Sequence, residues 1–206
     1  MQDTLAPLPI FIGRSIRWLG RKLGYVVTPF LITAEDLQPA NRPHLQLNPK
    51  FTLRELSEAD LPGIHNLRPD MSLPRYASLM KSGVRCFGIY DQDLLIAKMW
   101  LHLAEFNSEL YTHPLEADEA YLFDAFANPD YRGQNLAPIL RLHCYQVARE
   151  LGRQRIYSIT EFLNLPARGF KRKLPTAHAR LLLFIGKKRQ GKVQGRSYTL
   201  RRYSVA

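Results

Sequence analysis

The sequence predicts an α/β (α+β) fold, and three observations support this class. A chain of 206 residues, 46% of them hydrophobic and 23% charged, is long enough for one domain with a real core. From residue 51 onward, segments with strand-like alternation are interleaved with segments of helical period. No apolar run approaches the roughly 18 to 20 residues that a membrane-spanning helix needs. We therefore expect one globular domain and no transmembrane helix.

The predicted elements follow the order β, α, α, β, β, β, α, β, α, β, β. Residues 51–56 alternate as a strand, and Ser57 with Asp60 is typical of an N-cap that opens a helix over 58–67. The remaining predicted elements are a helix over 73–81, hairpin strands 86–90 and 94–103, a strand 119–127, a helix 136–151, a strand 155–160, a short basic helix 165–173, and strands 180–186 and 197–202.

The N-terminal 50 residues form a separate segment. In residues 10–27 apolar and basic side chains recur on opposite sides at helical spacing, which predicts a basic amphipathic helix. Its charges interleave with the apolar residues, unlike those of a secretory signal. The helix either lies on an anionic membrane, with Trp18 at the headgroup level, or packs on its own domain. Residues 34–50 carry three prolines and predict a linker. We therefore divide the chain into 1–50 and 51–206.

Cysteine and histidine usage excludes two classes of site. Cys86 and Cys144 lie far apart with no CxxC or Cys/His cluster around either, so neither a disulfide framework nor a metal site is predicted. His143, on the apolar face of the 136–151 helix, is expected in the core beside Cys144. This usage fits a reducing cytosol, and we expect a cytoplasmic protein.

The net charge of +11 is confined to the C-terminal part of the chain. Residues 1–161 hold 17 Lys and Arg against 18 Asp and Glu, whereas residues 162–206 hold 12 Lys and Arg and no acid. Such asymmetry favours an anionic partner, which could be a phosphorylated cofactor, anionic lipid, nucleic acid or an acidic substrate.

The joint between the strand 119–127 and the helix that begins at 136 can bind an anion. A strand that feeds a turn opening a helix offers backbone N–H groups and the positive end of a helix dipole, and Arg132 adds a charge there. Strand–turn–helix joints with one glycine are common, so the chemistry alone is a weak signal.

Two stretches resemble motifs of the GCN5-related N-acetyltransferases. Residues 132–137, RGQNLA, are similar to motif A of that family, Arg/Gln-x-x-Gly-x-Gly/Ala after the fourth strand, and residues 164–174, NLPARGFKRKL, resemble motif B. The resemblance spans about residues 51 to 202. It implies a mixed, mostly antiparallel sheet that splays between its fourth and fifth strands, with helices on both faces.

The resemblance also implies acetyl-CoA, or another acyl-CoA, as cosubstrate. The amides of 133–137 would hold its pyrophosphate, and the backbone of 126–128 would pair with the pantetheine arm and polarise the thioester carbonyl. The residues implied as cofactor-binding are Phe126, Ala127, Asn128, Arg132, Gly133, Gln134, Asn135, Leu136, Ala137, Asn164 and Phe170. Asn135 replaces the first glycine of motif A, and Asn tolerates positive φ.

Three residues are the catalytic candidates. A base must take a proton from the acceptor amine, and Glu119 stands thirteen residues before Arg132, the offset at which histone-modifying members of the family carry their glutamate. Asp124 is the second candidate. Because strand side chains alternate, we expect these two acids on opposite faces of the sheet. Lys171 stands where many members place a tyrosine that protonates the thiolate.

We therefore predict an acyltransferase that moves an acetyl or other acyl group to an amine or hydroxyl by direct transfer in a ternary complex. The alternative is a non-catalytic module of the same fold that binds nucleic acid or anionic membrane through its basic C-terminal region. The acceptor is expected to be acidic or amphiphilic, peripheral contact with the inner face of the membrane is open, and nucleic acid is the less favoured partner. The sequence defines no oligomeric state.

Overall fold

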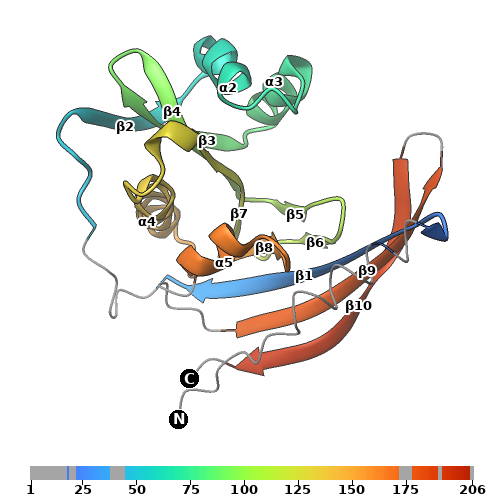
Figure 1. Ribbon diagram of the computed structural model, residues 1–206. Helices are drawn as coiled ribbons and strands as arrows, with labels where there is room; N and C mark the ends of the chain where they lie inside the picture. Colours follow the sequence, from blue (N-terminus) through green and yellow to red (C-terminus); the bar gives the residue numbers. More distant parts are fainter. Residues whose placement is uncertain (1–17, 19–21, 38–44, 172–177, 190–191, 205–206) are drawn as a thin grey trace. The chain divides into compact units, whose positions relative to one another are not determined.

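The computed structural model describes residues 18, 22–37, 45–171, 178–189 and 192–204, which fall into two compact units (Figure 1). The first unit comprises the described residues up to Glu35, residues 107–112 and those from 159 onward. The second unit comprises residues 36–106 and 113–158. Each unit is built around β-strands, as the sequence predicts for an α/β fold.

The second unit contains a mixed sheet with strand order β8-β7-β4-β3-β2. Its strands are β2 (Phe51–Leu56), β3 (Arg85–Asp91), β4 (Leu94–His102), β7 (Glu119–Ala127) and the first residues of β8 (Arg155–Glu161). All neighbours pair antiparallel except β7 and β8, which are parallel. The β7–β8 pairing covers Glu119 to Leu122 only, although β7 continues to Ala127. The pairing thus ends where the predicted splay requires it to end.

Helices cover both faces of this sheet, as predicted. Helix α4 (Leu136–Glu150) packs its apolar side on one face, where Phe87, Met99 and Leu122 are buried. On the other face the cluster that includes Cys86, Tyr76 and Trp100 is covered by α2 (Leu61–Leu67) and α3 (Leu73–Lys81).

The start of α2 follows the predicted capping pattern. A 3₁₀ turn, η1 (Glu58–Asp60), leads into α2, and Asp60 Oδ2 accepts a hydrogen bond of 2.8 Å from the backbone N–H of Ser57. The predicted helix over 58–67 is therefore confirmed, with a 3₁₀ first turn. The polar stretch after β4 forms a small two-stranded sheet of β5 (Glu105–Asn107) and β6 (Thr112–Pro114).

The first unit contains three long antiparallel strands in the order β10-β9-β1 (Figure 1). They are β1 (Tyr25–Asp36), β9 (His178–Arg189) and β10 (Lys192–Ser204), and helix α5 (Leu165–Lys171) belongs to the same unit. The two strands predicted near the C-terminus are thus confirmed and are longer than expected.

The prediction for the N-terminal segment is wrong at residues 25–27 and 34–36, whereas residues 37 and 45–50 of the predicted linker lie outside helices and strands, as expected. Residues 25–27, assigned to the amphipathic helix, and 34–36, assigned to a linker, belong to β1, which pairs with β9 from Tyr25 to Ala34. Trp18 and Lys22 are helical, and the rest of that predicted helix before Lys22 lies outside the described residues. The ten cross-strand pairs between β1 and β9 stabilise an extended conformation. They outweigh the helical pattern of residues 25–27, which covers less than one turn of a helix.

Both cysteines are buried and unpaired, Cys86 at 1% and Cys144 at 0% exposure. Burial raises the pKa of the Cys144 thiol to about 12 and also raises that of Cys86. His143 packs edge-on against Phe87, with ring centroids 5.1 Å apart, but it is half-buried and so lies at the edge of the core rather than within it. None of the described helices combines the length and the apolar run that crossing a bilayer requires.

Gly88 allows β3 to pack against two buried leucines. A Cβ at this position would lie 2.6 Å from Leu95 Cδ1 and 2.9 Å from Leu56 Cδ2. We expect Gly88→Ala to lower the free energy of unfolding by about 1–3 kcal/mol through overpacking. Urea denaturation measures this. In the control Gly63→Ala the nearest atom lies at 3.8 Å, so this variant should be at least as stable as the parent. Equal stability of both variants would contradict the packing argument.

Candidate functional site

The turn between β7 and α4 is held in place from both sides. At the end of β7 the backbone N–H of Asn128 donates to the Ile96 carbonyl at 2.8 Å, which ties the turn to β4. The Asn128 side chain accepts from the backbone N–H of Asp130 at 3.0 Å and caps a 3₁₀ turn, η2 (Pro129–Tyr131). Gly133 with φ +85° and Asn135 with φ +57° then turn the chain into α4. Asn135 therefore takes the left-handed conformation, which asparagine tolerates better than most residues.

This turn leaves a run of backbone donors without partners. Within the described residues, no group accepts a hydrogen bond from the N–H groups of residues 133–137. Residues 132–135 are exposed, and a Cβ on Gly133 would meet nothing within 4 Å. Consecutive amides at the start of a 15-residue helix, with the exposed Arg132 guanidinium in the preceding turn, are chemically suited to a pyrophosphate. The residues present fit the predicted cofactor phosphates.

A bulge interrupts β7 just before this turn. Trp100 of β4 pairs with Phe123 and Lys98 pairs with Phe126, so two residues of β7 stand opposite the single residue Met99. Asp124, one of the two, has φ +48°. The pairing with β8 ends at Leu122, so in the described part of the chain β8 does not pair with the backbone of residues 126–128. The predicted pantetheine-binding segment therefore follows a local break in the sheet.

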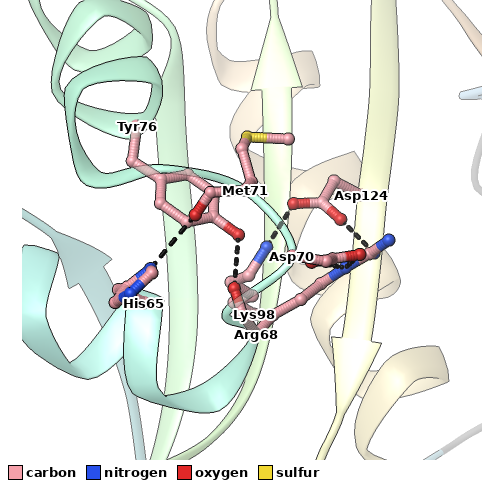
Figure 2. Close-up of polar contacts among 7 residues, drawn as sticks. All are labelled: His65, Arg68, Asp70, Met71, Tyr76, Lys98 and Asp124. Atoms are coloured by element: carbon pink, nitrogen blue, oxygen red, sulfur yellow. Dashed lines mark hydrogen bonds and ion pairs between the residues drawn. The ribbon is translucent and has the colours of Figure 1, made fainter.

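The bulge places Asp124 between two cations, as Figure 2 shows. Its carboxylate accepts from the Lys98 ammonium through Oδ2 and from the Arg68 guanidinium through Oδ1. The Lys98 side chain is 0% exposed and that of Asp124 is 7% exposed. Burial lowers the pKa of Lys98, and the Asp124 carboxylate opposes that effect. Asp124 is therefore the counter-charge of a buried lysine.

The loop after α2 completes this cluster. Arg68 also binds Asp70, with Nε 2.8 Å from Oδ1, and its backbone carbonyl accepts from the Tyr76 hydroxyl at 3.1 Å. The Lys98 ammonium lies 5.0 Å from the centroid of the Tyr76 ring. Burial raises the pKa of Tyr76 to about 12, so its hydroxyl keeps donating throughout the neutral range. The cluster fixes the connection between α2 and α3 to the sheet beside the bulge (Figure 2).

Glu119, at the start of β7, is buried and hydrogen-bonded. Its Oε1 accepts from the Tyr157 hydroxyl at 2.7 Å and from Arg155 at 3.3 Å, and its Oε2 accepts from the backbone N–H of Glu116 at 3.2 Å. The Glu119 side chain is 5% exposed, whereas that of Arg155 is 48% exposed. Burial and the bond to Glu119 raise the pKa of Tyr157, which stays protonated at neutral pH. Glu119 is thus a buried carboxylate whose cationic partner, Arg155, is half-exposed.

The expectation that the two acids lie on opposite faces is wrong. A row of aromatic rings connects them along the α2–α3 face of the sheet, and its successive members are Tyr157, Phe106, Tyr121, Phe123, Trp100 and Tyr76, with ring centroids 4.2–6.2 Å apart. Tyr157 donates to Glu119, and Tyr76 lies over Lys98 beside Asp124. Asp124 is itself one of the two bulged residues, and its positive φ breaks the alternation on which that expectation rested.

The other predicted site residues lie in the first unit. Lys171, at 9% exposure, donates from Nζ to Thr33 Oγ1 at 3.3 Å. Asn164 Oδ1 accepts from the backbone N–H of Ala167 at 3.2 Å and so caps α5. Phe170 belongs to α5, but its side chain lies outside the described residues. Their contacts with the cofactor and the role of Lys171 as an acid stay predictions.

Sequence reasoning missed the ion-pair cluster, although a signal for it exists. Lys98 interrupts the apolar run LLIAKMWL, and Asp124 interrupts LFDAFA. One charge of each sign inside two adjacent apolar strands predicts a buried pair, because an unpaired charge there is costly. Arg68 carries no comparable signal. In the part of the chain that the structure describes, no three His, Cys, Asp or Glu residues gather in a way that could hold a metal ion.

A mixed sheet with a bulged strand, followed by a turn of free amides that opens a long helix, defines the acyl-CoA N-acyltransferase class of fold. Comparison with family models matches residues 51–174 to the acetyltransferase (GNAT) family. The match covers more than half of the chain, which therefore belongs to this family, as its motifs suggest. The family uses acetyl-CoA as acyl donor to an acceptor substrate, so membership supports acyl transfer in general.

Solved structures agree with this fold at low sequence identity. A GCN5-related N-acetyltransferase from Sphaerobacter thermophilus is 14% identical, with a TM-score of 0.55 over 82% of this chain and 55% of its own. A Novosphingobium aromaticivorans protein described as a GNAT-family acetyltransferase is 19% identical, with a TM-score of 0.54 over 81% of this chain and 69% of its own. A Drosophila protein, of which this chain spans 52%, has a TM-score of 0.53 at 16% identity over 79% of this chain. The search of curated proteins finds no match.

The buried pair generates a prediction on stability. Asp124→Asn leaves Lys98 without its counter-charge, so we expect a loss of about 3–5 kcal/mol at neutral pH. The lowered pKa of Lys98 should fall further, and the unfolded chain then holds a proton that the folded chain lacks. The loss should therefore shrink as the pH rises toward the ordinary lysine range. Denaturation curves at several pH values measure it.

The control for this prediction removes both charges. Lys98→Met combined with Asp124→Asn should recover most of the stability and lose the pH dependence, because no buried ammonium remains. A double variant that is as unstable as Asp124→Asn alone would show that Asp124 acts through another group.

Proposed function

We propose that this protein transfers an acetyl or other acyl group from acyl-CoA directly to an amine, or to a hydroxyl, of an acceptor bound in the same ternary complex. The run of unpartnered amides at residues 133–137 carries this proposal, because it lies at the family's motif A and opens a long helix, whose N-terminus favours a phosphate. Proximity and orientation within such a complex supply much of the rate acceleration.

Two neighbouring segments of the chain would bind different parts of the donor. The amides of 133–137 and Arg132 would hold the pyrophosphate of the donor. The backbone of residues 126–128, unused by β8 pairing, would receive the pantetheine arm and donate a hydrogen bond to the thioester oxygen. Bound acyl-CoA supplies the activated acyl group and a thiolate that leaves readily.

Glu119 is the proposed base that takes the proton from the attacking amine. Protonating Asp124 would leave the buried Lys98 ammonium without its counter-charge. The cation beside Glu119, by contrast, is Arg155, which is 48% exposed and stays hydrated. Tyr157 positions the Glu119 carboxylate through a bond of 2.7 Å. Charge balance therefore favours Glu119 as proton acceptor and gives Asp124 a structural role.

The acceptor is proposed to carry an amine together with anionic or amphiphilic character. The described residues from 162 onward include Arg168, Arg180, Lys187 and Arg196 and no acid. Part of this charge would serve the phosphates of the donor, and the remainder would favour an acidic or phosphorylated acceptor. An acceptor screen by mass spectrometry would identify it.

Ala137→Glu tests the phosphate cradle. The new carboxylate would face the donor phosphates at the start of α4, so we expect calorimetry to show no CoA binding while the circular dichroism and the thermal midpoint are unchanged. Ala137→Gln adds the same bulk without charge and should weaken binding less. Asn135→Gly should bind equally or better, because glycine adopts positive φ without cost. Unchanged CoA affinity in Ala137→Glu would remove the basis of the proposal.

Glu119→Gln tests the base. We expect turnover with an amine acceptor to fall by roughly 10² to 10⁴ at neutral pH with CoA affinity retained. Thiol release from acetyl-CoA measures turnover once an acceptor is found. The matched control is Glu116→Gln, an exposed neighbour with the same change of charge, which should stay active. An active Glu119→Gln beside an inactive but folded Asp124→Asn would assign the base to Asp124.

A further inference from the structure

One face of the three long strands in the first unit is covered at one end and exposed at the other. The residues of β1, β9 and β10 that stand opposite one another form four rows across this face. The rows are Tyr25–Lys187–Gln194, Val27–Ile185–Arg196, Pro29–Leu183–Tyr198 and Leu31–Leu181–Arg201. Residues directly opposite one another in antiparallel strands point to the same side. In the last row Leu31 and Leu181 are buried against Phe162. The first three rows, which we call the outer face, lead away from that cover, and Pro29 in the third row is still buried.

Large apolar side chains on the outer face are exposed to solvent. Tyr25 is 43% exposed, Ile185 38% and Tyr198 51%, one on each of the strands β1, β9 and β10. Val27 and Leu183 between them are half-buried. Because one aliphatic and two aromatic side chains gather on a single sheet face, this is a contiguous patch rather than scattered exposed residues.

Cations accompany these apolar residues, and no acid does. Lys187 and Arg196 are exposed within the rows, Arg201 is exposed at their inner end, and none of the four rows holds Asp or Glu. The Lys187 ammonium lies 5.6 Å from the centroid of the Tyr25 ring. The outer face thus combines aromatic, aliphatic and cationic groups, which is the mixture that an anionic lipid–water interface accommodates.

The charge distribution disfavours a second copy of this chain as the occupant. A twofold interface would set the outer face against itself. Lys187 and Arg196 would then meet cations of the other copy with no carboxylate to pair with. Repulsion in a desolvated interface opposes such a dimer.

Nucleic acid fits the outer face less well than lipid. Single-stranded nucleic acid needs a series of free aromatic faces on which successive bases stack. Of the two exposed tyrosines on the outer face, Tyr25 is engaged by Lys187, which leaves Tyr198 as a single ring rather than a stacking platform. The central row presents Val27 and Ile185, which offer bases nothing to stack on but give acyl chains an apolar surface. Exposed apolar residues also occur before β1 in the chain, with Trp18 at 58% and Leu23 at 64%. Tryptophan and tyrosine are the residues that membrane interfaces favour.

We propose that the outer face of β1, β9 and β10 docks on an anionic membrane surface. Tyr25, Ile185 and Tyr198 enter the headgroup region, and Lys187 and Arg196 meet the lipid phosphates. This inference does not rest on the proposed acyl transfer, because vesicle binding needs neither acyl-CoA nor an acceptor.

The experiment is flotation of the full chain with vesicles of phosphatidylcholine, with and without phosphatidylserine. The parent protein should float with the anionic vesicles and much less with the neutral ones, and salt should weaken the binding. Lys187→Gln with Arg196→Gln should lower the partition coefficient roughly 25-fold, about fivefold for each charge. Arg202→Gln is the matched control. Arg202 is an exposed cation of β10, like Arg196, but it and its cross-strand partner Arg180 lie outside these rows. It should change the coefficient by less than about twofold.

A second variant tests the apolar part of the outer face. Ile185→Ser with Tyr198→Ser removes two exposed side chains, so folding should persist by circular dichroism, and binding to anionic vesicles should fall about tenfold or more. Three results would overturn the proposal. These are parent protein that stays in solution with anionic vesicles, preferential binding of a single-stranded oligonucleotide that the Lys187 and Arg196 changes abolish, and a dimer in light scattering that Ile185→Ser with Tyr198→Ser dissociates.

Discussion

The bulge in β7 is the constraint from which the rest of the site follows. An extra residue between Phe123 and Phe126 breaks the alternation of the strand and frees its backbone next to the turn that opens α4. Asp124 has a positive φ, which aspartate adopts more readily than most residues, and its carboxylate pairs with the buried Lys98. One electrostatic contact inside the sheet therefore accompanies the backbone conformation on which the proposed donor binding depends.

The second unit could be predicted largely from sequence because its signals are local. Alternation in FTLREL, the Ser57–Asp60 cap and the helical period of residues 136–151 each lie within one element, and each leads to the observed element. The strand β1 could not be predicted in this way. A proline at position 29 argues against an interior strand, and the evidence for β1 lies in its partner β9, about 150 residues further along the chain.

The candidate site was predictable where it depends on the backbone and not where it depends on geometry across strands. Asn135 takes the left-handed conformation that asparagine tolerates, and the run of amides follows from the strand–turn–helix order. The common face of Glu119 and Asp124 depends on a single extra residue in β7, and no pattern within that strand distinguishes a bulge from regular pairing. Alternation is a reliable guide only while the register is unbroken.

Because both cysteines are buried, we expect neither to react with thiol reagents while the protein is folded. Cys86 and Cys144 lie on either side of the sheet of the second unit, each almost fully enclosed and each with a raised pKa, so little reactive thiolate forms at neutral pH. A disulfide reagent that releases a coloured thiolate, added to the native protein during an assay, would therefore react only with the thiol of the CoA that is released. The same reagent would register two additional equivalents per chain once the protein unfolds, so one chromophore distinguishes turnover from loss of structure.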